Sequence, residues 1–155
     1  MAFYYLRKKA KLVTHRYTTA DSHFCQLVEK TYKEWDELKD KDNYDWTGRH
    51  ALVEQILAER PWNRAERPWV KAGTIYVPVH VKGNHWVLAV ISIPERSVTV
   101  YDSLLTGRYA VIDHMAELIP IILCKRVWDI RTDEYHSSLP FDVVYASFMP
   151  QQRNG

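Results

Sequence analysis

Residues 74–103 contain three segments with the pattern of β-strands, joined by turns of only a few residues. The first, "TIYVPVHV" (74–81), and the third, "RSVTVYDS" (96–103), alternate between apolar and polar side chains. The middle segment, "HWVLAVISI" (85–93), is apolar on both faces, as is typical of a central strand. Pro78 indicates that the first strand lies at a sheet edge or carries a bulge. This block predicts two successive β-hairpins.

The second hairpin allows a prediction of register. If Pro94 and Glu95 are the two central residues of its turn, strand pairing at a constant sum of residue numbers places Val87 opposite Asp102. His85 then shares a face with Val87 and lies diagonal to Asp102, with the backbones roughly 7 to 8 Å apart. An imidazole and a carboxylate can meet across that gap. A three-residue turn would instead send the two side chains to opposite faces.

A contact between His85 and Asp102 has a chemical use. A carboxylate that accepts one imidazole N–H fixes the tautomer, leaves the second ring nitrogen as a base, and stabilises the imidazolium. Catalysis would further need a nucleophile and an oxyanion hole. In the alternative interpretation, His85 is an ordinary histidine at a strand edge and Asp102 only ends a strand.

The remaining elements complete an α+β pattern. Helical spacing runs through residues 21–41, where Asp21 or Ser22 is expected to cap the helix, and through residues 48–60. Residues 108–125 are helical until Pro120, which we expect to interrupt the helix. Residues 141–148, "FDVVYASF", read as a buried strand. With 155 residues, of which 46% are apolar, the chain is expected to form one domain over residues 1–155.

Composition excludes several classes of protein. The 21 basic and 19 acidic residues nearly balance, which argues against a nucleic-acid partner. No continuous apolar stretch approaches the about 18 residues of a membrane span. Cys25 and Cys124 are far apart in the chain and indicate free thiols in a reducing, intracellular compartment.

Three motifs in order carry a resemblance to a known family. "HWVLAVI", then "VYDSL", then "MPQQRNG" near the printed C-terminus together resemble the ubiquitin-like-protein-specific cysteine proteases, which include the sentrin-specific (SUMO-specific) proteases. The N-terminal residues also resemble plant, transposon-associated members of that family. The resemblance implies a papain-like (adenain-like) fold with a mixed sheet, no cofactor or metal, a SUMO-type protein as partner, and a monomer, with residence in the nucleus also consistent with the family.

The resemblance also implies roles for four residues. His85 is similar to the general base, and Asp102 to the carboxylate that orients it. Gln152 matches the side-chain donor of the oxyanion hole, which can contribute about 10² to 10³ in rate. Trp86 resembles the aromatic wall of a narrow tunnel that accepts a Gly-Gly tail.

The chain departs from the family pattern in two respects. The family's usual tryptophan before the first core helix is absent, since "YTTADSHF" has no Trp. The family's nucleophilic cysteine follows the glutamine in an Asp-Cys-Gly motif, and the printed sequence stops before such a motif. We therefore expect a catalytic domain truncated at its C-terminus, inactive as a 155-residue chain. The alternative is a pseudoprotease, or binding module, that holds the tail of a ubiquitin-like protein without cleaving it.

Other interpretations of the same residues remain open. Cys25 is a candidate nucleophile because it lies in the first turn of a helix, where a thiolate is favoured. Its apolar neighbours instead indicate a structural role. His80 and His85 flank a turn and are candidate ligands of a shared metal ion, although no further ligand stands at a usable spacing. Transposon-associated DNA binding is a third class of function, against which the charge balance argues.

Overall fold

A five-stranded mixed sheet forms the centre of the protein. The computed structural model describes residues 17–21, 23–47, 50–57, 68–104, 107–126 and 137–147. Its strands are β1 (Tyr17–Thr19), β2 (Thr74–Val81), β3 (His85–Ser92), β4 (Ser97–Tyr101) and β5 (Asp142–Tyr145), in the spatial order β1-β2-β3-β4-β5. The central pairs are antiparallel, whereas β1 runs parallel to β2 and β5 parallel to β4. The expected α+β class with a mixed sheet is confirmed.

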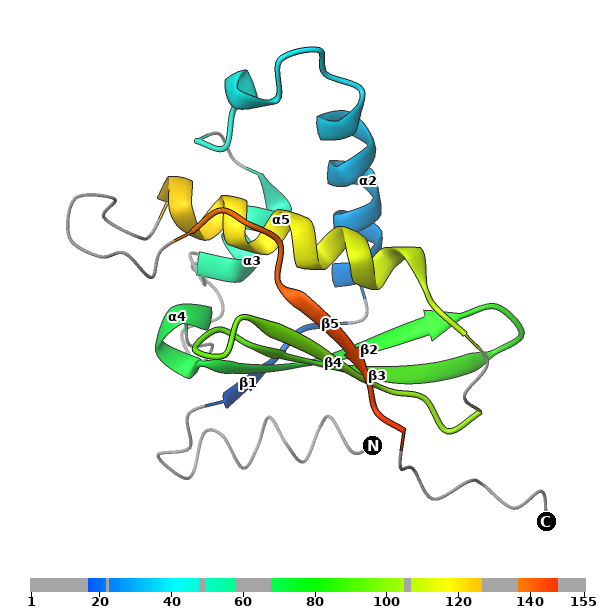
Figure 1. Cartoon of the computed structure of the whole chain (residues 1–155). Helices are drawn as coiled ribbons and strands as arrows, with labels where there is room; N and C mark the ends of the chain where they lie inside the picture. Colours follow the sequence, from blue (N-terminus) through cyan, green and yellow to red (C-terminus); the bar gives the residue numbers. More distant parts are fainter. Residues whose placement is uncertain are drawn as a thin grey trace.

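Helices cover one face of this sheet. The described helices are α2 (Phe24–Asp36), α3 (Ala51–Leu57), α4 (Trp69–Ala72) and α5 (Ala110–Arg126), with a short 3₁₀ helix at Lys41–Asn43. Figure 1 shows α2, α3 and α5 on the same side of the strands. Alternate residues of β2, β3 and β4 point toward these helices and are buried, so the core lies between the two layers. None of the described helices is long and apolar enough to cross a membrane.

Helix α2 buries one stripe of side chains, as its spacing predicted. Phe24, Val28, Thr31 and Trp35 are buried on this stripe. The expected cap is wrong: the N-cap residue is His23, which makes no side-chain capping bond. The side chain of Asp21 instead accepts the backbone N–H of His23 at 3.0 Å, and Ser22 lies outside the described residues.

Helix α5 continues through Pro120, so the expected interruption is wrong. A proline has no N–H and therefore leaves the carbonyl four residues before it without a helical partner. That carbonyl, of Ala116, accepts the backbone N–H of Phe141 at 2.9 Å. Because the segment leading into β5 satisfies this acceptor, the missing helical hydrogen bond leaves no unpaired carbonyl at Ala116.

Two expectations about strands need correction. Residues 141–148 were expected to form a buried strand, but β5 is an edge strand whose residues alternate between exposed and partly buried. β2, where Pro78 predicted an edge or a bulge, lies between β1 and β3. The three residues of β1 pair only with Thr74–Tyr76, so β2 is locally an edge at Pro78, where a missing N–H costs nothing.

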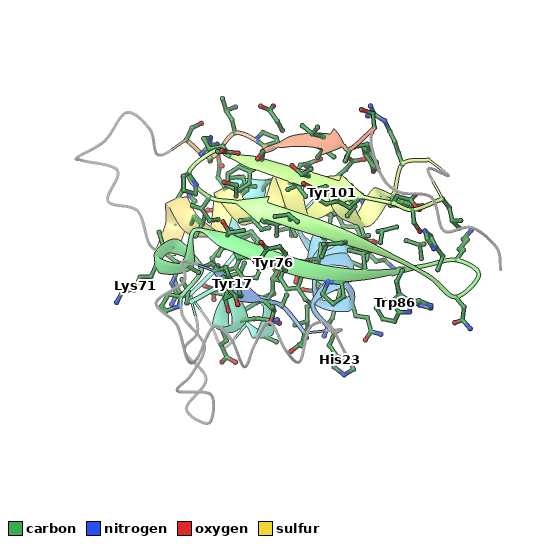
Figure 2. The ribbon with its side chains drawn as sticks, turned by 90° about the horizontal axis from the view of Figure 1, so that it is seen from below. Tyr17, His23, Lys71, Tyr76, Trp86 and Tyr101 are labelled. Carbon is green, nitrogen blue, oxygen red and sulfur yellow. The ribbon has the colours of Figure 1, made fainter. Side chains whose placement is uncertain are left out.

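The face of the sheet opposite the helices also carries apolar side chains. Viewed from that side, Figure 2 shows Tyr17, Tyr76, Trp86 and Tyr101. The rings of Tyr17 and Tyr76 meet edge to face, with centroids 5.7 Å apart. The prediction that β3 is a central strand with two apolar faces is confirmed, but its outer face is only partly buried.

Candidate active site

The β3–β4 hairpin has the predicted register. Ser92 pairs with Ser97 and Leu88 with Tyr101, which is the constant sum expected for a turn centred on Pro94 and Glu95. The N–H of Arg96 donates to the carbonyl of Ile93 at 3.3 Å and closes this turn. Continuing this register by one residue places Asp102 opposite Val87 of β3.

The turn between β2 and β3 fixes where β3 begins. Gly83 and Asn84 in this turn both adopt left-handed backbone conformations, with φ of 77° and 61°. Glycine and asparagine tolerate this region better than other residues, which explains their presence at this position. The turn places Val81 opposite His85, so the histidine is the first residue of the central strand.

His85 and Asp102 are in hydrogen-bond contact. Nε2 of His85 lies 2.7 Å from Oδ1 of Asp102, and the two side chains are 15% and 3% exposed. An ionised carboxylate only accepts hydrogen bonds, so the imidazole carries its proton on Nε2. No described residue bonds to Nδ1. The geometry therefore leaves Nδ1 as the ring nitrogen that can take up a proton from a substrate or nucleophile.

The carboxylate of Asp102 is held by further donors. Oδ1 also accepts the backbone N–H of Leu104 at 3.0 Å, and Oδ2 accepts the hydroxyl of Tyr109 at 2.6 Å. Sequence reasoning did not identify Tyr109. The only available signal was its position in the first turn of the helix predicted over residues 108–125, because the start of that helix must return toward the strand end at Asp102.

Trp86 lies on the other face of β3 from His85, since successive residues of a strand point to opposite faces. It is 53% exposed, and its ring packs against that of His80 with centroids 4.7 Å apart. Figure 2 shows Trp86 near the turn that joins β2 to β3. Trp86 thus adjoins His85 along the chain and presents its ring to solvent.

The two cysteines have environments that disfavour a thiolate. Burial, together with the nearby carboxylates of Glu29 and Asp21, raises the pKa of Cys25 to about 11. Its Sγ lies 3.8 Å from the carbonyl oxygen of Pro78, which it contacts as a weak donor. Burial also raises the pKa of Cys124. Neither environment suits a nucleophile, which needs a lowered pKa.

Two further expectations concern ligands. Gln152, the expected oxyanion donor, lies outside the described residues. Across the described ranges, no group of three or more His, Cys, Asp or Glu side chains is arranged to hold a metal ion. His80, the candidate metal partner of His85, pairs with Trp86 across the hairpin and packs against its ring.

Two solved structures that this chain is similar to are protease domains. The chain resembles the C-terminal Ulp1 protease domain in complex with Smt3, the yeast ortholog of SUMO, at 20% identity over 90% of this chain and 50% of that one, with a TM-score of 0.44. It resembles the Chaetomium thermophilum Ulp1-like SUMO protease catalytic domain at 19% identity over 83% of this chain and 40% of that one, with a TM-score of 0.46. This chain thus spans half or less of these two proteins.

A search of curated proteins returned no match. The model of the Ulp1 protease family, C-terminal catalytic domain, matches residues 1–155. This match covers the whole printed sequence, including the strand that begins at His85 and the strand end at Asp102. The chain belongs to the Ulp1 protease family.

Proposed function

We propose that this chain carries the general base and its orienting carboxylate in a cysteine-type peptidase. The observation that supports this most directly is the 2.7 Å bond from Nε2 of His85 to Asp102, which leaves Nδ1 to accept a proton. Membership of the Ulp1 protease family supports the reaction class. His85 is the proposed base, and Asp102 holds its tautomer and stabilises the imidazolium.

The proposed mechanism begins with proton transfer. Nδ1 of His85 takes the proton of a cysteine thiol. The thiolate then attacks the carbonyl carbon of the last glycine of a Gly-Gly tail. The oxyanion is held by the side-chain amide of Gln152 and a backbone N–H. The imidazolium then protonates the leaving amine, and water hydrolyses the thioester. Since Cys25 and Cys124 are poor nucleophiles, the proposed nucleophile is a cysteine of the complete gene product, in the family's Asp-Cys-Gly motif.

The proposed substrate is a SUMO-type protein or its conjugates. The relative crystallised with Smt3 supports this class of partner. Trp86 is the proposed wall for the Gly-Gly tail, supported by its exposed ring next to His85 in sequence. We further propose that the complete gene product is a monomer of the plant, transposon-associated type that acts inside the cell, in the nucleus.

The test compares two histidine variants of the complete gene product. With a fluorogenic SUMO-type substrate, His85→Ala should lower kcat by at least about 10³-fold, because the base is lost. His23→Ala is the matched control, since His23 is an exposed histidine whose side chain makes no capping bond to α2. Its kcat should stay within about twofold of the parent. Equal activity of His85→Ala and the parent would refute the proposed base.

A second candidate is binding without cleavage. The raised pKa values of Cys25 and Cys124 favour it for the 155-residue chain by itself. In this case the chain should bind a SUMO-type protein that ends in Gly-Gly and should not bind the same protein without this tail. Calorimetric titration of the 155-residue chain with each of these two proteins measures the difference in binding. Cleavage of the fluorogenic substrate by the 155-residue chain would contradict this function.

A further inference from the structure

We propose that Tyr109 is a positioning residue that acts through Asp102. Its hydroxyl fixes the carboxylate in the orientation that keeps the proton of His85 on Nε2 and leaves Nδ1 unprotonated. The catalytic consequence of this inference rests on the function proposed for His85. The structural part, which concerns the tautomer of the imidazole, does not.

The contacts of Asp102 explain why one hydroxyl matters. Oδ1 accepts from His85 and from the N–H of Leu104, while Oδ2 accepts from Tyr109. Because donors hold both oxygens, the carboxylate cannot rotate about its Cβ–Cγ bond without breaking several hydrogen bonds. Without the hydroxyl, Oδ2 would lose the donor that Tyr109 supplies, and rotation of the carboxylate would change the direction of the acceptor that His85 meets.

Tyr109 is itself fixed from two sides. Its N–H donates to the hydroxyl oxygen of Tyr145 on β5 at 3.0 Å. Its carbonyl accepts the N–H of Ile112 at 3.1 Å, in the first turn of α5. The ring of Tyr109 packs against the core. The residue therefore ties the start of α5 and the edge strand β5 to the end of β4, and its hydroxyl has little freedom to leave Asp102.

A tyrosine hydroxyl suits this position chemically. The side chain of Asp102 is 3% exposed, so few water molecules can solvate its charge. A neutral O–H donor stabilises the ionised carboxylate without adding a positive charge that would compete with the imidazolium. A phenylalanine would fill nearly the same volume and donate nothing, so Tyr109→Phe isolates the hydrogen bond.

The first test measures kinetics of the complete gene product. Tyr109→Phe should lower kcat by about 10-fold, as expected for losing a hydrogen bond to a charged group, with KM within about twofold. The control is Tyr101→Phe, on the opposite face of the sheet, one residue before Asp102, which should leave kcat unchanged. An unchanged kcat in Tyr109→Phe would overturn the inference.

A double-mutant cycle tests whether Tyr109 acts through Asp102. In an Asp102→Ala background, Tyr109→Phe should have no further effect on kcat, because the carboxylate it orients is gone. If the same roughly 10-fold loss appears in both backgrounds, Tyr109 acts independently of Asp102 and the inference is wrong. A merely structural role would produce that additive result.

The second test needs no activity and uses the 155-residue chain. Above the titration range of the histidines, ¹⁵N shifts of the imidazole should show His85 with its proton on Nε2, and a mixture of tautomers in Tyr109→Phe. A pure Nε2–H tautomer in that variant would overturn the inference. If His85→Ala leaves activity intact, the proposed function fails while this tautomer result still stands, so the two failures are distinguishable.

A measurement on the unmodified residue covers the case in which Tyr109→Phe does not fold. The hydroxyl proton of Tyr109 should appear as a slowly exchanging downfield resonance, because it lies in a 2.6 Å bond to a buried carboxylate. It should disappear in Asp102→Asn, which retains the shape of the side chain but removes the charge. Its absence in the parent chain would contradict the bond on which the inference depends.

Discussion

Cys25 and His85 lie on neighbouring layers of the fold and differ in their partners. Nε2 of His85 donates to the carboxylate of Asp102, which fixes the tautomer of the imidazole. Cys25 is partly buried between α2 and β2, near two carboxylates, and these surroundings raise its pKa to about 11. Burial and negative neighbours both disfavour a thiolate. A cysteine in the first turn of a helix is thus not sufficient evidence for a nucleophile.

This difference predicts the pH dependence of thiol modification. A raised pKa keeps Cys25 protonated at pH 7, so a Cys124→Ser chain should react slowly with iodoacetamide there. The rate should rise only as the pH approaches about 11. In urea, the unfolded chain should show the rise nearer the ordinary pKa of 9.0. Mass spectrometry of the alkylated chain gives the rate, and rapid modification of the folded chain at pH 7 would contradict the assignment.

The strand register predicted the contact of His85 with Asp102. A two-residue turn, together with the alternation of side chains along a strand, fixes which side chains share a face. The same reasoning could not find Tyr109. Its position depends on the path of residues 103–108 and on how α5 packs across the sheet, which are tertiary features without a periodic signal. The helix cap failed for a different, local reason: the carboxylate of Asp21 bonds to the N–H of His23 two residues on instead of capping the helix.

At the scale of elements, Pro120 shows how tertiary structure overrides a local rule. A proline in a helix interior costs about 3 kcal/mol relative to alanine, mainly through a lost hydrogen bond and a steric clash. Here the N–H of Phe141 bonds to the carbonyl of Ala116 that Pro120 leaves without a partner. The proline therefore helps to join α5 to the segment that enters β5.

We therefore expect Pro120→Ala to change the free energy of unfolding only slightly. The new N–H would compete with Phe141 for the carbonyl of Ala116, so the gain in free energy of unfolding should be under ~1 kcal/mol instead of ~3 kcal/mol. Urea unfolding measures this difference. Hydrogen exchange supplies the control, because the amide of Phe141 should exchange faster in the variant. A full gain of ~3 kcal/mol with unchanged protection of Phe141 would contradict the argument.

The strand β5 shows a second limit of local reasoning. Its apolar residues, "DVVY", are consistent with a buried strand or with an edge strand packed on one side. The choice depends on β5 pairing in parallel with β4, a contact between residues more than 40 positions apart. Helix α5 lies between these two strands in the chain, and Figure 1 shows it on the helical side of the sheet.

At the scale of the whole molecule, the sheet has one covered and one open face. Among the described residues, helices cover only the inner face (Figure 1). The outer face presents Trp86, which is 53% exposed, and Val144, which is 49% exposed, with Leu88 and Val90 partly exposed between them. An apolar surface of this kind favours association when nothing covers it. β5 adds an edge at which strands of two molecules can pair.

The 155-residue chain should therefore associate as its concentration rises, and Val144→Lys should reduce this association. The lysine would place a charge on both the open face and the edge strand, which opposes apolar contact and strand pairing together. Gln26→Lys is the matched control, since it adds the same charge at an exposed position of α2, on the helical side. Sedimentation velocity over a range of concentrations should show a lower weight-average mass for Val144→Lys than for the parent and for Gln26→Lys.

If Gln26→Lys lowers the mass equally, net charge controls association and the open face does not. If the parent chain stays monomeric at all concentrations, the outer face does not drive association at all.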